Sequence, residues 1–250
     1  MPIYPLVIPR TPAMVLSFVL GRRRSFRDDA QAYLRALKPP LAVGGRSLPD
    51  VSSGRWLVLA NHYHRDGFPS WWIALAVSAL LPAEVLWVMS GAWTYPDWIR
   101  AHTISPLTRW AFARLAHSYG YVTMPPMPPR PAEVQQRARS VRRVLGLAAA
   151  SKDLIVALAP EGRDTSGGRL EAPAPGAGRF ISLLTHLGYQ PLPAGVYEAD
   201  GRLWVWFGEP LILSDAICLS AQEREDYTNA RVMRSIAACL PHELRGIYGD

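Results

Sequence analysis

Lysine is almost absent from this 250-residue chain, and cysteine is scarce. Lys38 and Lys152 are the only lysines, so the formal net charge of +7 comes almost entirely from arginine. Arginine makes planar, paired contacts with phosphate and carboxylate, which leaves nucleic acid, anionic lipid and phosphorylated substrates open as ligands. A GC-rich genome that favours arginine codons would give the same composition. The two cysteines, Cys218 and Cys239, lack metal-ligand spacing. So few cysteines, both near the C-terminus, suggest a reducing compartment without structural disulfides.

The chain also lacks an uninterrupted apolar run of the roughly 20 residues that a membrane span requires. Its most apolar stretch, residues 71–89, is interrupted by Pro82 and Glu84 and is better divided between a helix and a strand. Residues 1–20 are apolar, and arginines follow at 22–24, whereas a secretory signal carries its charge before the apolar stretch. This order suits the headgroup region of an anionic membrane. A helix packed on the domain is the equal alternative.

Strand and helix patterns alternate along the chain, which indicates an α/β domain. Its composition, 49% apolar and 19% charged, fits a globular protein with a full core. We expect a single domain with a mostly parallel sheet flanked by helices over residues 41–250, preceded by an N-terminal helical segment at 1–40. The predicted strands are 55–60, 84–90, 121–124, 154–158, 192–196 and 203–207. The predicted helices are 28–37, 69–80, 105–119, 132–150, 178–187 and 220–240.

A histidine and a nearby carboxylate follow the first predicted strand. Ligand crevices of open α/β sheets lie at such strand ends. His62 therefore has the position and the chemistry of a general base. A carboxylate on the other ring nitrogen would fix the tautomer and stabilise the imidazolium. Asp66 can supply it if residues 61–67 fold back as a turn; otherwise Asp66 caps the helix that begins near Pro69.

A metal site is the competing interpretation of the same residues. The order His62-x-His64-x-Asp66 resembles the first metal motif of the metallo-β-lactamase superfamily, which also follows an apolar strand. In that superfamily another histidine directly follows the aspartate, whereas this chain has Gly67. The later histidines stand without partner carboxylates. We therefore expect no metal here.

A second polar, turn-rich segment follows the strand predicted at 154–158. Pro160-Glu161-Gly162, followed by Arg163 and a Gly-Gly turn, can present backbone N–H groups and a guanidinium to a phosphate. Together, the two segments suggest a hydroxyl nucleophile that attacks an activated acyl group near a bound phosphate.

In their order, these segments resemble the motifs of the glycerolipid acyltransferase family, which contains the bacterial lysophosphatidic acid acyltransferases. That family has Asn-His and a later Asp after its first strand, then Pro-Glu-Gly, a glycine-rich helix start, a Pro-Val strand and a strand ending in Gly-Glu-Pro. The matching residues here are 61–66, 160–162, 176–178, 191–196 and 207–210. Three departures stand out. The family's middle motif, a Gly-aromatic stretch ending in Arg, is represented only by Gly120-Tyr121-Val122. Three residues instead of four separate the His from the Asp, and Arg-Asp replaces the family's Thr-Arg after Glu-Gly.

The resemblance implies a glycerol-phosphate acyltransferase-like fold and an O-acyltransferase activity of the phospholipid/glycerol type. The donor would be a thioester, either acyl-CoA or acyl carrier protein, and the acceptor a hydroxyl of a lysophospholipid, a glycerol-phosphate or a related lipid. His62 would be the base and Asp66 would orient it. The remaining expected site residues would bind or shape the acceptor: Glu161, Gly162, Arg163 and Pro193.

The resemblance also implies the protein's surroundings. No cofactor and no nucleic-acid partner are expected, and the protein would sit peripherally on the cytoplasmic face of an anionic membrane. Two alternatives remain: a non-catalytic lipid-binding relative of the same fold, and a metal-dependent hydrolase using His62, His64 and Asp66.

Overall fold

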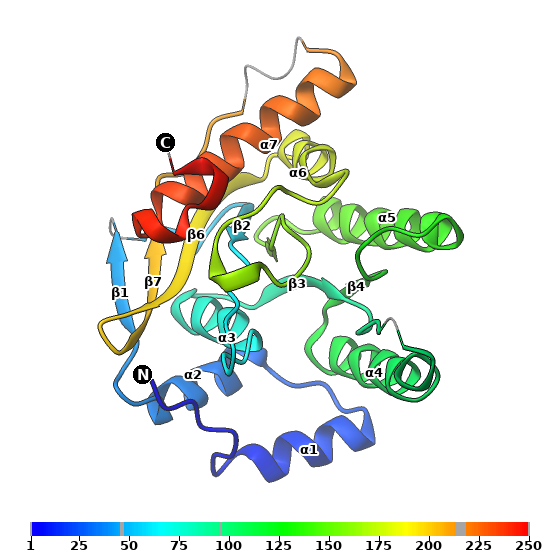
Figure 1. Cartoon of the computed structure of the whole chain (residues 1–250), viewed down its shortest axis with the longest axis vertical. Helices are drawn as coiled ribbons and strands as arrows, with labels where there is room; N and C mark the ends of the chain where they lie inside the picture. Colours follow the sequence, from blue (N-terminus) through cyan, green and yellow to red (C-terminus); the bar gives the residue numbers. More distant parts are fainter. Residues whose placement is uncertain (1, 46–47, 96, 214–218, 250) are drawn as a thin grey trace.

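The computed structural model describes residues 2–45, 48–95, 97–213 and 219–249, and its centre is a seven-stranded sheet flanked by helices (Figure 1). The strand order is β1-β7-β6-β2-β5-β3-β4. The strands are β1 (Ala42–Gly45), β2 (Trp56–Ala60), β3 (Val85–Ser90), β4 (Val122–Met124), β5 (Ile155–Leu158), β6 (Gln190–Ala199) and β7 (Arg202–Phe207). The helices are α1 (Thr11–Leu20), α2 (Phe26–Ala36), α3 (Trp71–Leu80), α4 (Trp98–Tyr119), α5 (Val134–Ala150), α6 (Ala177–His186) and α7 (Ala221–Ala238). The predicted α/β class with a mostly parallel sheet is confirmed.

The central strands β2 and β5 are parallel neighbours, with Leu59 opposite Leu158. Every residue of both strands is buried, as expected for strands that are covered on both faces. β6 is the other neighbour of β2 and is also parallel to it. Among the paired strands of the described residues, β6 and β7 form the one antiparallel pair, and they are joined by a two-residue turn in which Asp200 and Gly201 both have positive φ. The carboxyl ends of β2 and β5 therefore meet at one edge of the sheet.

Helix α4 begins earlier than the sequence indicated. We predicted a start at Ser105, with Pro106 in the first turn. The helix instead begins at Trp98, where the Asp97 side chain accepts the backbone N–H of Arg100, and Pro106 lies in its interior. The aspartate cap stabilises the earlier start because it accepts a backbone N–H group that has no partner within the helix. The proline costs the helix one backbone hydrogen-bond donor, which does not end it here.

Strand β1 was not predicted, because two of its four residues are glycines and give no apolar pattern. It is held as an edge strand by parallel pairing with β7. Gly44 is required there, since a Cβ at this position would lie 2.4 Å from the Trp206 ring. The ring comes from a neighbouring strand that is distant in the sequence, so the local sequence does not show why a glycine is needed here.

The N-terminal segment forms two helices, and α1 lies at one end of the molecule, opposite α7 (Figure 1). The buried Asp29 of α2 attaches this segment to the domain. Its carboxylate accepts hydrogen bonds from Arg24 Nε at 2.7 Å and from the Tyr119 hydroxyl of α4 at 3.0 Å. Helix α1 itself has no buried residue. None of the helices in the described parts of the chain is both long enough and apolar enough to cross a membrane.

Candidate active site

The loop after β2 is fixed to the sheet by its first residue, Asn61. The side chain is buried, its amide N–H donates to the Val196 carbonyl at 3.0 Å, and its oxygen accepts the Val196 N–H at 2.7 Å. Through these two side-chain hydrogen bonds, Asn61 extends the pairing of β2 with β6 by one residue beyond the end of β2. We did not assign it this role from the sequence, although a buried asparagine directly after an apolar strand is a usable signal.

Glu161 joins the loop after β5 to the loop after β2. Its side chain is only 1% exposed, and its two carboxylate oxygens accept the backbone N–H groups of His62 at 2.6 Å and Glu171 at 2.9 Å. Burial raises the pKa of the Glu161 carboxyl, while the two N–H donors act in the opposite direction. The Thr165 hydroxyl donates to the His62 carbonyl at 3.0 Å. The loop after β5, which we call the second loop, therefore holds the backbone of His62 through both its N–H and its carbonyl group.

The imidazole of His62 faces a carboxylate of the second loop. Its Nδ1 lies 3.1 Å from Asp164 Oδ1, and the two side chains are 28% and 51% exposed. The neighbouring imidazole holds the pKa of Asp164 below its ordinary value, which shows that the ionised carboxylate is favoured beside the ring. With a carboxylate at Nδ1, Nε2 is the nitrogen that can take a proton from a substrate hydroxyl. An imidazole placed in this way has the chemistry to act as a general base.

Asp66, the expected partner of His62, lies elsewhere. Residues 65–68 form a tight turn in which the Phe68 N–H donates to the Arg65 carbonyl at 2.9 Å and Gly67 has a φ of 78°. Asp66 occupies the exposed second position of this turn. Over the described residues, no hydrogen bond or ion pair joins its side chain to His62. The structure thus does not bring the expected pair together, because the turn places the Asp66 carboxylate in solvent.

The remaining expected residues occupy three different environments. Gly162 is exposed, with a φ of 67° that favours glycine. Arg163 is also exposed, and its guanidinium lies 2.8 Å from the Glu171 carboxylate. Pro193 is buried inside β6, where its carbonyl accepts the Gly208 N–H at 2.9 Å. Gly162 and Arg163 are accessible to a ligand, whereas Pro193 belongs to the sheet.

A polar cluster that was not predicted from the sequence connects the N-terminal segment to the site. Glu198, at the end of β6, accepts hydrogen bonds from the Tyr4 hydroxyl at 2.7 Å and from Arg65, and more weakly from the Tyr63 hydroxyl at 3.3 Å. Burial raises the pKa of Tyr4, so its hydroxyl remains a donor. The cluster holds the loop after β2, which we call the first loop, against the end of β6. Because its residues are far apart in the sequence, no local motif predicts their contacts.

The competing metal hypothesis requires His62, His64 and Asp66 to converge. In the parts of the chain that the structure describes, no group of three or more His, Cys, Asp or Glu side chains is arranged to hold a metal ion. The exposed position of Asp66 in its turn is the physical reason that this set does not form.

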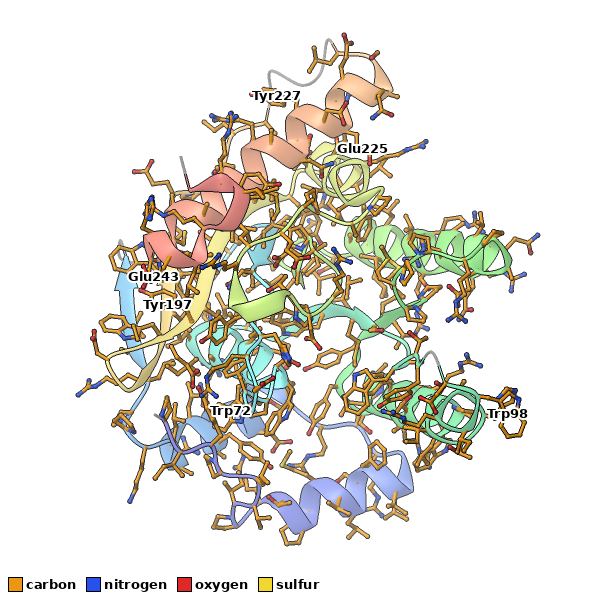
Figure 2. The ribbon with its side chains drawn as sticks, viewed as in Figure 1. Trp72, Trp98, Tyr197, Glu225, Tyr227 and Glu243 are labelled. Atoms are coloured by element: carbon orange, nitrogen blue, oxygen red, sulfur yellow. The ribbon has the colours of Figure 1, made fainter. Side chains whose placement is uncertain are left out.

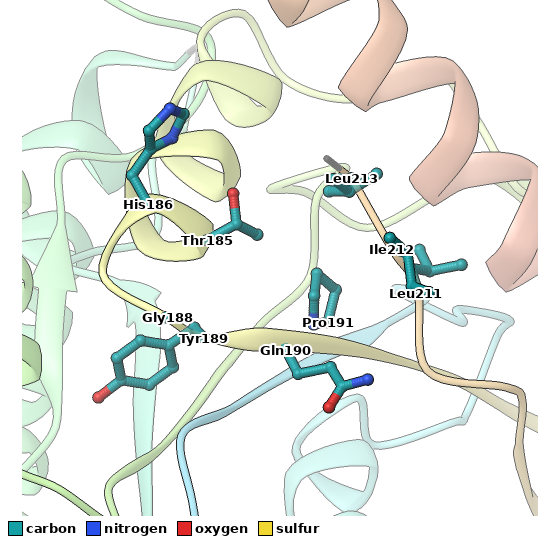
Figure 3. Close-up of a pocket in the computed structure, with 9 residues that line it drawn as sticks. All are labelled: Thr185, His186, Gly188, Tyr189, Gln190, Pro191, Leu211, Ile212 and Leu213. Carbon is teal, nitrogen blue, oxygen red and sulfur yellow. The ribbon is translucent and has the colours of Figure 1, made fainter. Parts of the chain in front are cut away.

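A cavity of about 370 Å³ lies elsewhere, where β6 begins (Figure 3). This is the amino end of β6, and the His62 site lies at the carboxyl edge of the same sheet. The lining is mainly apolar: Thr185, His186, Gly188, Tyr189, Gln190, Pro191, Leu211, Ile212 and Leu213. The cavity therefore does not adjoin the candidate site.

Comparisons with known proteins find similarity at the level of structure and not of sequence. No model of a known protein family matches the chain, and no curated protein sequence matches it. Its structure is similar to the crystal structure of the 1-acyl-sn-glycerophosphate (LPA) acyltransferase PlsC from Thermotoga maritima. The similarity covers 93% of this chain and 83% of that chain, at 15% sequence identity and a TM-score of 0.48.

Proposed function

We propose that this protein is an O-acyltransferase that moves a fatty acyl group from a thioester to a hydroxyl of a glycerolipid acceptor. The observation that carries the proposal is the placement of His62. It stands at the shared carboxyl edge of β2 and β5, with its backbone held by Glu161 and Thr165 and its Nδ1 facing a carboxylate. A base held in this way suits the activation of a hydroxyl nucleophile.

In the proposed reaction, His62 Nε2 accepts the proton of the acceptor hydroxyl while the oxygen attacks the thioester carbonyl carbon. The tetrahedral intermediate collapses with cleavage of the carbon–sulfur bond, and the imidazolium returns the proton to the leaving thiolate. The products are an ester and a free thiol. The donor is acyl-CoA or acyl carrier protein, and both release a thiol that can be measured.

The second loop would bind the acceptor. Arg163 would exchange its contact with Glu171 for the phosphate of a lysophospholipid or a glycerol-phosphate, and Gly162 would let the backbone approach that group. Glu161 would shape the site by holding His62, and Pro193 would support the sheet edge below it.

The donor and acceptor lipids would be met at a membrane surface. Both α1 and α4 carry exposed apolar side chains, and the two helices are joined by edge-to-face packing of Phe18 on Trp110. We propose that these side chains, which we call the α1/α4 apolar surface, contact the membrane. Trp98 projects from the start of α4 (Figure 2), and it is 74% exposed. The members of the surface are Val15, Leu16, Val19, Leu20, Trp98, Ile99, Ile104, Leu107 and Trp110.

Exposed arginines accompany this surface at positions 10, 22, 23 and 109. Large exposed apolar patches mark interaction sites, and basic side chains beside them are attracted to anionic lipid headgroups. We place the protein peripherally on an anionic membrane, at its cytoplasmic face.

The test of the catalytic proposal is release of the carrier thiol when a lysophospholipid or glycerol-phosphate is offered with acyl-CoA or acyl carrier protein. His62→Ala should lower the rate by about 10²–10⁴-fold, the usual effect of losing a positioned base. His64→Ala is the matched control and should be much milder. A His64→Ala loss as large as that of His62→Ala would contradict the assignment. Lipid binding without thiol release would favour the non-catalytic alternative.

A further inference from the structure

We propose that Asp164, supplied by the second loop, is the carboxylate that orients His62. This inference rests on the proposed function, because it assigns a positioning residue to the proposed base. The carboxylate thus comes from the loop after β5 instead of from the aspartate that closely follows the histidine in the chain.

Three residues of the second loop hold His62 at three different points. Glu161 accepts its backbone N–H, Thr165 donates to its backbone carbonyl, and Asp164 lies 3.1 Å from ring Nδ1. The first two contacts fix the backbone but leave rotation about the side-chain bonds free. The third contact is the one that selects a ring orientation, and with it the tautomer that leaves Nε2 available. Among the described residues, Nδ1 makes no hydrogen bond of ordinary geometry, and the Asp164 carboxylate at 3.1 Å is the charged group that faces it, a distance from which a small rotation of either side chain forms the bond.

Asp66 cannot take this position without loss of its turn. The turn buries Phe68, whose ring packs edge-to-face on Tyr63 with centroids 4.9 Å apart. Moving the Asp66 carboxylate to His62 would open the hydrogen bond between Phe68 and Arg65 and expose that ring.

One contact also accounts for two features of the sequence. The interval between His62 and Asp66 is one residue shorter than in the glycerolipid acyltransferase pattern, and an aspartate stands at 164 where that pattern has an arginine. The short interval removes the local carboxylate from the ring, and the aspartate at 164 restores one. The shortened interval and the aspartate at 164 therefore compensate for each other: one carboxylate is lost beside the ring and another is gained there.

The activity test compares two variants with the same chemical change, Asp164→Asn and Asp66→Asn. Because Asp164 is half exposed, solvent weakens its effect relative to a buried triad aspartate. We expect Asp164→Asn to lower kcat by about 10–100-fold with little change in KM, and to change the pH profile of kcat. Asp164→Glu should recover part of the loss. Asp66→Asn should stay within about twofold of the parent protein. An equal loss in Asp66→Asn, or a loss in Asp164→Asn confined to KM, would overturn the proposal.

A second measurement does not depend on catalysis. The Asp164 carboxyl carbon is titrated by NMR in the parent protein and in His62→Gln. Since His62 is the main cause of the lowered pKa of Asp164, with His64 contributing less, that pKa should rise in the variant. An unchanged titration would overturn the pairing itself. A rise in a protein that transfers no acyl group would contradict the acyltransferase proposal and leave the pair standing.

Discussion

The carboxylate of Glu161 accepts the backbone N–H of His62 at 2.6 Å, although the two residues are 99 positions apart in the chain. This bond connects the loops that follow β2 and β5. It makes the position of the candidate base depend on a buried charge, because Glu161 is almost completely covered. The pair therefore links the stability of the sheet edge to the geometry of the site.

Replacing Glu161 by glutamine should be costly. The carboxylate serves two N–H donors, whereas glutamine offers one oxygen and turns an NH₂ group toward the other donor. We expect Glu161→Gln to lower the free energy of unfolding by about 1–3 kcal/mol, and to lower kcat as His62 shifts. Denaturant unfolding and thiol release measure the two effects. Glu171→Gln, which changes a partly exposed ion pair, is the control and should cost less than about 1 kcal/mol.

The same carboxyl should give stability a defined pH dependence. Burial raises the folded-state pKa of Glu161 above its ordinary value of 4.5. The folded protein therefore binds this proton more tightly than the unfolded chain, and the contribution is fully present below the unfolded pKa. It is lost as the pH rises through the folded pKa. Relative to Glu161→Gln, the parent protein should lose stability as the pH rises from about 4.5. Parallel stability curves for the two proteins would contradict this.

The sequence predicts the elements at the site well, because their signals are local. The central strands β2 and β5 are short apolar runs followed by polar turns, and both were predicted to within one residue. Helix α4 was predicted seven residues too short, since the proline at 106 is a stronger local signal than the aspartate cap at 97. Such a competition between two local signals is decided by packing along the whole helix.

The partner of His62 could not be predicted in this way. The sequence offers Asp66 nearby, and the family resemblance selects the same residue. The turn of residues 65–68 removes Asp66, and the register of β2 on β5 brings Asp164 to the ring. The register that brings the two loops together is a property of the folded sheet, so the local sequence of either loop does not predict it. The contacts of Glu198 with Tyr4 and Tyr63 were not predicted for the same reason, since these residues meet only in the folded chain.

The ion pair between Arg163 and Glu171 should regulate binding of a phosphorylated acceptor. Lysine cannot reproduce the planar, two-pronged contact of arginine, so Arg163→Lys should raise KM for a phosphorylated acceptor several-fold and leave an unphosphorylated one unchanged. Glu171→Gln removes the competing carboxylate and should lower that KM. Steady-state kinetics with paired acceptors checks both. Equal activity of Arg163→Ala on the two acceptors would show that Arg163 does not contact phosphate.

The α1/α4 apolar surface predicts how the protein binds membranes. Leu16 and Leu107 are 56% and 61% exposed, so changing both to glutamine should leave thermal melting unchanged. Each leucine that enters the lipid contributes up to about 1.5–3 kcal/mol. The double variant should therefore bind anionic vesicles at least tenfold more weakly in a sedimentation assay. Ile247→Gln, an exposed apolar residue outside this surface, is the matched control.

The arginines beside that surface predict a dependence on salt and lipid charge. Each basic side chain near an anionic membrane contributes about 1 kcal/mol, and this attraction fades as ionic strength rises. Binding should favour anionic over zwitterionic vesicles and weaken between low and high salt. Deleting residues 1–24 should reduce it sharply, provided that thermal melting shows a folded domain. A folded truncated protein that binds as tightly as the full chain would place the contact on another surface. Salt-insensitive binding would mean that apolar insertion alone holds the protein, since only the charge attraction is screened.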